Sequence, residues 1–245
     1  MLQAEKALQQ PDFTLAKALY THLHEKMPND VYVVQKLILA TYKAKLPSEK
    51  EALEEALKLL QGLNPRESTD TETLRLSQAV HKILWNLTQD RSYLEEAIWA
   101  SEKGFYLKDD HYNGINLAYL YNVRASISEG LDVVTDFVLA QRTRSRVIQL
   151  CQGLLDQTRT PTSGKWFDRD AKYSLLEILA QAWMGLGNEA ECQNCLDELF
   201  ALDPPPPAWS KESTEECLHR LRTLLAHLQL KIGLTPTQPA ASKSQ

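Results

Sequence analysis

A chain of 245 residues has room for one long domain or two short ones. Its composition, 43% hydrophobic and 24% charged, is typical of a well-packed globular protein. A net charge of −5 and a pI near 5.7 exclude an overall basic field that would attract nucleic acid or anionic lipid. Along the chain, apolar residues recur at helical spacing, and no convincing two-residue alternation predicts a strand.

The first half of the chain reads as a series of helices separated by turn residues. A capping box at Ser48 and Glu51, in which the two side chains satisfy free backbone donors, opens the third helix. A second box of this type, at Ser92 and Glu95, predicts another helix start. The predicted helices in this half are 12–27, 31–46, 49–63, about 71–88, 93–107 and 112–126.

The second half continues this pattern with longer segments. The segment 131–157 is unusually long for one repeat helix, and we expect it to be bent or broken near its start. The stretch 158–165 reads as a linker, and a pair of helices follows over 168–202. Ser213 and Glu216 predict a capping box for a last amphipathic helix over 212–232, and the tail 234–245 is predicted to be disordered.

The stretch 173–204 is the most regular part of the chain and reads as one helix-turn-helix unit of the tetratricopeptide type, about 34 residues long. Small residues at Ala180 and Cys192 allow its two helices to approach closely, and Gly187 marks the turn. Such a unit cannot bury its apolar face alone, so it predicts stacked neighbours and an inner groove. We therefore predict an all-α, tetratricopeptide-like α-solenoid of about ten or eleven helices, forming a single domain over residues 1–233.

Sequence signatures of catalysis are missing: there is no GxSxG, Walker loop, GxGxxG or HExxH. Cys192 and Cys195 form a C-x-x-C, which could be a metal or redox pair. Because no second pair lies at ligand spacing and both cysteines fall inside a predicted helix, a structural role is favoured. We predict a protein that is not an enzyme and that has no metal and no cofactor.

The N-terminus carries no apolar run long enough for a signal peptide, and no stretch approaches the length of a membrane span. We therefore expect a cytoplasmic protein with reduced thiols, without membrane or nucleic-acid partners.

One candidate site is the polar and aromatic string at 104–116. Tyr112, Asn113 and Asn116 begin a first helix of a repeat, and Arg124 follows on the same helix. First helices line the concave surface of such arrays, and helix N-terminal amides favour an anion. In the alternative interpretation the polar residues cap helix ends and Tyr112 packs between repeats.

A second candidate row lies on two earlier first helices. Lys36 and Lys43 are two helical turns apart, while His81, Lys82 and Trp85 share the next first helix. Cations beside an aromatic ring suit a phosphate, a carboxylate or an acidic peptide. The alternative is a solvated lysine face with Trp85 in the core. The only basic run, 141–146, is predicted to be a solvated surface because its alternate arginines point in different directions.

The central block resembles a known family. The residues that carry the resemblance are Lys36, the run 40–43, the run 71–73, His81-Lys82, Trp85 and the string GFYLKDDHYNGIN at 104–116. They resemble the TRAFs-binding domain of apoptosis signal-regulating kinases and of bacterial tetratricopeptide-like sensor proteins, over about residues 10–200. The resemblance implies a helical regulatory module. There is no kinase domain from which to infer kinase activity, and the short, stand-alone chain suggests a bacterial source.

Two functions from different classes follow. The first is a protein-interaction or regulatory module, expected in a signalling or stress or defence pathway, which recruits a protein partner through its groove or its terminal repeats. The second is a sensor that holds a small nucleotide-like or other anionic ligand in a concave pocket. The residues proposed for either role are Lys36, Lys43, His81, Lys82, Trp85, Tyr112, Asn113, Asn116 and Arg124.

Overall fold

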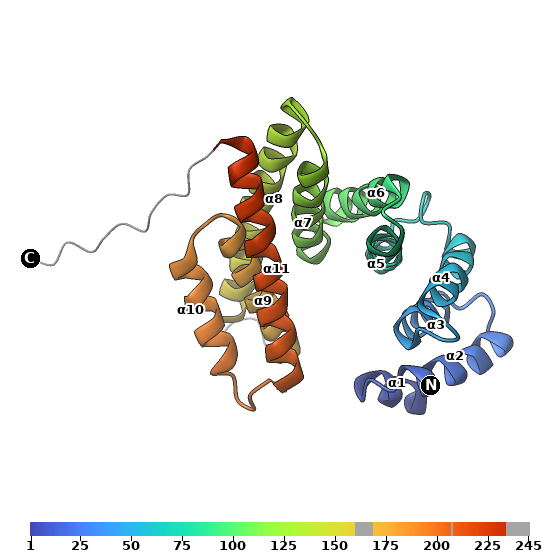
Figure 1. The fold of residues 1–245 in the computed structure, drawn as a ribbon. Coiled ribbons are helices and arrows are strands. Elements are labelled where there is room, and N and C mark those ends of the chain that lie inside the picture. Colours follow the sequence, from blue (N-terminus) through green and yellow to red (C-terminus); the bar gives the residue numbers. More distant parts are fainter. Residues whose placement is uncertain (160–168, 207, 234–245) are drawn as a thin grey trace, which may run out of the picture. The chain divides into compact units, whose positions relative to one another are not determined.

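The computed structural model describes residues 1–159, 169–206 and 208–233, and the only regular elements within these ranges are eleven helices (Figure 1). The all-α prediction is confirmed. The helices are α1 Leu2–Gln9, α2 Phe13–Lys26, α3 Val31–Ala44, α4 Glu49–Leu63, α5 Thr71–Thr88, α6 Arg91–Lys108, α7 His111–Ile127, α8 Leu131–Arg159, α9 Arg169–Gly185, α10 Glu189–Phe200 and α11 Ala208–Ile232.

The chain divides into two compact units, Met1–Asn113 and Gly114–Gln245. Within each unit, helices that follow one another pack together, as α2 does on α3 and α9 on α10. Alternate helices also meet, since α3 contacts α5 and α9 contacts α11. This pattern is that of a tetratricopeptide-like array, in which α3, α5, α7 and α9 are the first helices of successive pairs and α11 follows the last pair. The single domain over 1–233 stays a prediction.

In the first unit, the main core lies between α3, α4 and α5. Ile38, Leu53 and Val80 are among its fully enclosed members. The short helix α1 was not predicted, because eight residues offer too little periodicity to detect. Its small residues Ala4 and Ala7 are buried in a second cluster with Tyr20, so tertiary packing stabilises this helix.

Of the three predicted capping boxes, one is confirmed as an N-cap. The Ser48 side chain accepts a hydrogen bond from the Glu51 amide at 3.2 Å. The box at Ser92 is wrong, since Asp90 is the N-cap and its carboxylate accepts from the Ser92 amide at 2.9 Å. The box at Ser213 is also wrong, since α11 begins at Ala208, five residues earlier than the predicted cap.

The early start of α11 has a tertiary cause. The Tyr173 hydroxyl of α9 lies 2.5 Å from Ser210 Oγ and 3.3 Å from Thr214 Oγ1, and both of these residues are buried. Packing on α9 therefore extends the helix beyond the start that the Ser-x-x-Glu pattern indicated.

The helix α8 is continuous from Leu131 to Arg159, so a break near its start is wrong, while a bend there stays a prediction. Its buried residues Val133, Ala140, Val147 and Cys151 follow one face at spacings of seven, seven and four, and no glycine or proline precedes Gly153. Residues 158 and 159 of the predicted linker belong to this helix. The rest of the linker and the tail 234–245 lie outside the described residues.

The basic run at 141–146 departs from its prediction at one position. Arg142 and Arg146 are exposed, as predicted for a solvated surface. Arg144 is 1% exposed and is the largest fully buried side chain among the described residues. Its direction along the helix places it against α7 and α9 rather than in water. Both cysteines of the C-x-x-C motif are buried, and neither forms a disulfide.

Candidate functional site

A partly buried hydrogen-bond network joins α3 to the start of α5 in the first unit. The amide nitrogen of Gln35 donates to Asp70 Oδ2 at 2.5 Å and lies 3.0 Å from Thr73 Oγ1. Asp70 is also the N-cap of α5, because its carboxylate accepts from the Thr73 amide at 2.8 Å. Burial opposes ionisation of this carboxyl, but the bonds from Thr73 and Gln35 hold its pKa below the ordinary value. The two first helices are thereby fixed side by side.

A cluster of charged and aromatic side chains lies on these helices and on the start of α7. Arg75 donates two hydrogen bonds to the Glu72 carboxylate, at 2.7 and 2.5 Å. The centre of its guanidinium lies 5.1 Å from the centroid of the Tyr112 ring. Burial disfavours the charge of Arg75, but Glu72 and Tyr112 raise its pKa above the ordinary value. Arg75 is therefore a fixed cation that joins α5 to Tyr112.

Lys43 stands beside this cluster and is exposed. Its ammonium lies 5.7 Å from the centroid of the Tyr42 ring. Partial loss of solvation lowers the pKa of Lys43, and repulsion from Lys45 and Arg75 lowers it further. Lys45 is paired with Glu49 at 2.8 Å, whereas no carboxylate of the described chain forms an ion pair with Lys43. Lys43 is thus a cation crowded by other cations.

A shallow cavity of about 360 Å³ opens at this point. Its lining residues come from the end of α3, the start of α4 and the end of α5, and they are Tyr42, Lys43, Lys45, Glu49, Ile83, Asn86 and Leu87. Lys45 is paired with Glu49, so Lys43 is the lining cation without an ion pair, and Ile83 and Leu87 supply apolar surface. The cavity therefore suits a group that carries negative charge next to an apolar part.

The other predicted residues of α3 and α5 have local contacts. Lys36 is half-buried, with its ammonium 5.2 Å from the centroid of the Tyr32 ring. His81 Nδ1 lies 2.7 Å from the Ser77 carbonyl oxygen, which fits a proton on that nitrogen. Burial lowers the pKa of His81. Trp85 is 7% exposed, and Lys82 is half-buried.

Tyr112 and Asn113, at the start of α7, differ in their surroundings. Tyr112 is exposed and contacts Arg75. Asn113 is 1% exposed, and a Cβ on Gly104 would fall 2.6 Å from its side chain, so Gly104 makes room for it. Asp110 accepts from the Asn113 amide at 2.8 Å, as a capping residue does.

Asn116 and Arg124 belong to the second unit. Asn116 is half-buried. Arg124 forms a two-bond ion pair with Asp136 of α8, at 2.9 and 2.8 Å. The ligand or partner role of all nine predicted residues stays a prediction.

Sequence reasoning did not name Tyr42, Glu72 or Arg75 as site residues, although Tyr42 and Glu72 lie in the runs 40–43 and 71–73 that carry the family resemblance. The spacing of Glu72 and Arg75, three apart on one helix face, was available as a signal. No sequence signal indicated the approach of Tyr112 to Arg75, because this contact depends on how α5 and α7 pack.

Residues 12–121 match the sequence model of the Tetratricopeptide Repeats-Sensor family. The matched part contains α2 to α6 and most of α7, and therefore the cluster just described. It supports a tetratricopeptide-like sensor or interaction module, while the finer assignment to the TRAFs-binding domain is not confirmed.

One solved structure, the crystal structure of MamA protein, is similar at 17% identity, with a TM-score of 0.43, over 80% of this chain and 86% of that chain. At this level of similarity nothing follows from it for this chain. A search of curated proteins found no match. In the described part of the chain, no helix has the length and apolar character needed to cross a membrane, and no group of three or more acidic, His or Cys side chains could hold a metal ion.

Proposed function

We propose that this protein is a non-catalytic, tetratricopeptide-like interaction and regulatory module that acts in the cytoplasm, in a signalling or stress or defence pathway. Its partner presents an acidic group to the face formed by Lys43, Arg75 and Tyr112. The observation that carries the proposal is the crowding of Lys43 by Lys45 and Arg75 without an ion-pair partner in the described chain. An acidic partner group would offset that repulsion.

The geometry of this face fits recognition better than catalysis. Arg75 is held by Glu72, and Tyr112 lies against its guanidinium, so two of the three groups are already ordered before a partner arrives. The three residues come from three first helices, the elements that line the concave side of tetratricopeptide arrays.

The experiment compares the proteins that co-purify with the wild type and with two charge-reversed variants. Lys43→Glu replaces the crowded cation with an anion, and Lys58→Glu makes the same change at an exposed residue of α4 that does not line the cavity. We expect a specific partner that Lys43→Glu loses and Lys58→Glu retains. A set of partners that is identical for all three proteins would contradict the proposal.

A second candidate function is a sensor of a small anionic or nucleotide-like ligand. The cavity of about 360 Å³ beside Lys43 favours it, since this volume is near the lower limit of small-molecule sites. Thermal unfolding with a nucleotide panel separates the two functions. A bound ligand at ~100 times its dissociation constant adds ~2.7 kcal/mol of stability. A rise in melting temperature that Lys43→Met abolishes would support the sensor. No rise with any nucleotide would support the protein-interaction module instead.

A further inference from the structure

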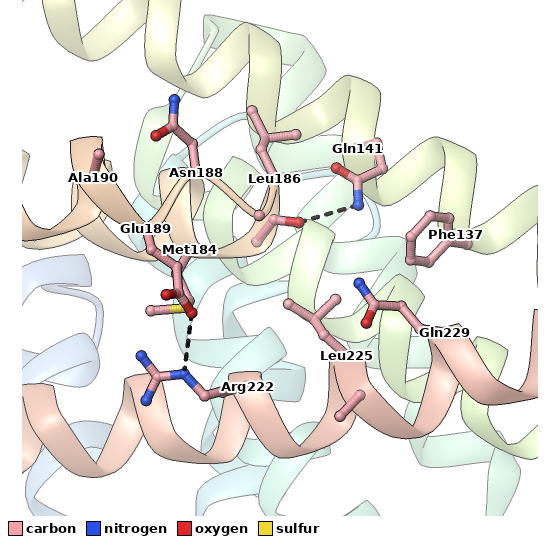
Figure 2. Close-up of a pocket in the computed structure, with 13 residues that line it drawn as sticks. Phe137, Gln141, Met184, Leu186, Asn188, Glu189, Ala190, Arg222, Leu225 and Gln229 are labelled. Carbon is pink, nitrogen blue, oxygen red and sulfur yellow. Dashed lines mark hydrogen bonds and ion pairs between the residues drawn. The ribbon is translucent and has the colours of Figure 1, made fainter. Parts of the chain in front are cut away.

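A cavity of about 720 Å³ lies in the second unit. Figure 2 shows its walls, which come from α8, from the turn between α9 and α10, and from α11. Phe137, Met184 and Leu225 supply apolar surface, while the carboxamides of Gln141 and Gln229 supply hydrogen-bonding groups. This volume and this mixture are typical of small-molecule sites.

The charges on the cavity wall cancel. Glu189, the first residue of α10, lies 3.9 Å from Arg222 of α11, and both side chains are exposed (Figure 2). Their separation makes this a loose pair at the mouth of the cavity. Neither residue therefore gives the cavity a net charge.

A further cation lies directly behind one wall. A Cβ on Gly185, a residue of that wall, would fall 2.0 Å from Arg144 Nε, so the side chain of Arg144 lies against the Gly185 backbone. Arg144 donates to Asn122 Oδ1 at 2.5 Å and to the Gly185 carbonyl at 3.5 Å, and both acceptors are neutral. Its buried Nε has no hydrogen-bond partner in the described chain.

The charge of Arg144 is consequently not balanced by a carboxylate. Burial alone lowers its pKa, to about 9, which leaves it protonated at neutral pH. A positive charge in surroundings of low polarity acts strongly on groups a few ångströms away. Since Gly185 has no side chain, Arg144 lies directly against the backbone of this wall residue, whose carbonyl oxygen also accepts from Gln141 Nε2 at 3.1 Å.

We propose that the cavity between α8, the α9–α10 turn and α11 binds a small organic anion with an apolar body, attracted by the buried charge of Arg144. The apolar body lies against Phe137, Met184 and Leu225, and the acidic group faces the Gly185 wall. The first turn of α10 also borders this cavity through Asn188, Glu189 and Ala190; the Glu191 amide is already bonded to Asn188 Oδ1, which leaves the amides of Glu189 and Ala190 as the first-turn donors beside an anion. This site lies outside residues 12–121 and does not rest on the function proposed above.

Thermal unfolding with two probes of nearly equal shape tests the requirement for charge. Phenylacetate carries an apolar ring and a carboxylate, and phenylacetamide replaces the carboxylate with a neutral amide. We expect phenylacetate to raise the melting temperature in a saturable way and phenylacetamide to leave it unchanged. Equal shifts with the two compounds, or no shift with phenylacetate, would overturn the proposal.

Three variants then locate the site. Ala226→Phe fills the cavity from an exposed position on α11, and Arg144→Met removes the buried charge. Each should abolish the shift caused by phenylacetate, whereas Ala201→Phe, the same change at an exposed residue outside the cavity, should keep it. If Arg144→Met does not fold, Ala226→Phe decides: a shift that persists in Ala226→Phe places the anion elsewhere and overturns the proposal.

Discussion

Lys43 in the first unit and Arg144 in the second both lack a carboxylate partner in the described chain, and these two cations differ in how they are stabilised. Lys43 of the first unit is exposed, although Lys45 and Arg75 crowd it. Arg144 of the second unit is enclosed and bonds only to the neutral oxygens of Asn122 and Gly185. An exposed cation can meet a ligand directly, whereas an enclosed one can act only through the wall that covers it.

The largest effect is expected where the enclosed cation is displaced. Gly185→Ala places a methyl group on Arg144, so the buried charge must move or lose its acceptors. We expect a loss of about 3 kcal/mol in the free energy of unfolding, measured by urea denaturation. Gly153→Ala is the control, because its new methyl meets no atom within 4 Å and lies in the interior of α8. It should stabilise by up to about 1 kcal/mol, and equal losses in both variants would contradict the account.

The next largest loss of stability is expected at a close packing contact in the first unit. Gly104→Ala brings a methyl group into the side chain of Asn113, which is almost fully enclosed. The expected loss is about 2 kcal/mol. The double variant Gly104→Ala with Asn113→Ala removes the clash, so a double-mutant cycle should give a favourable coupling. Additive losses would show that Gly104 and Asn113 do not meet.

A smaller, pH-dependent effect is expected at the cap that joins α3 and α5. Asp70→Ala removes the acceptor for Thr73 and Gln35, with an expected loss of about 1–2 kcal/mol at neutral pH. Because the pKa of Asp70 is lowered in the folded state, its contribution is present above its unfolded pKa of about 4 and is lost as the pH falls through its folded pKa. Urea denaturation as a function of pH should show that the difference in unfolding free energy between Asp70→Ala and the wild type decreases at acidic pH. A difference in unfolding free energy that does not change with pH would show that the ionised Asp70 carboxylate is not the source of this stability.

The smallest effect is expected at the exposed cation. Lys43→Met removes a charge whose pKa is lowered in the folded state, so it should keep or raise the melting temperature. The cost of this charge is present below its folded pKa and disappears as the pH rises through its unfolded pKa. The advantage of Lys43→Met should therefore be largest near neutral pH and should vanish in strong alkali. A clear loss of stability would show that Lys43 is structural.

The sequence was sufficient to predict the described helices other than α1, because helical periodicity is a local property that α3, α4 and α5 display over three or more turns each. The N-cap Ser48 was predictable because a capping box is also a local sequence pattern. Ser92 and Ser213 failed because Asp90 competed as a cap in one case and contacts with Tyr173 extended α11 in the other. A pattern of four residues shows neither that a neighbouring residue will act as the cap nor that tertiary contacts will extend the helix.

The candidate site was predictable only in part. Lys43 and Tyr112 were selected from residue type and helix position, and the structure gives each a cation–aromatic contact. Arg75 was missed because its meeting with Tyr112 depends on the packing of α7. Arg144 was assigned to a solvated face because a sequence alone does not show which side of a long helix is covered.

The most direct test of the proposed partner-binding face is photocrosslinking from Tyr112, in cells that produce the protein with a benzophenone amino acid at that position. Tyr112 is exposed next to Arg75, and Tyr106, an exposed tyrosine of α6, is the control position. The account predicts a discrete protein adduct from position 112 that is absent from position 106 and is lost in Lys43→Glu. An adduct at position 112 that persists unchanged in Lys43→Glu, or no adduct at all, would contradict it.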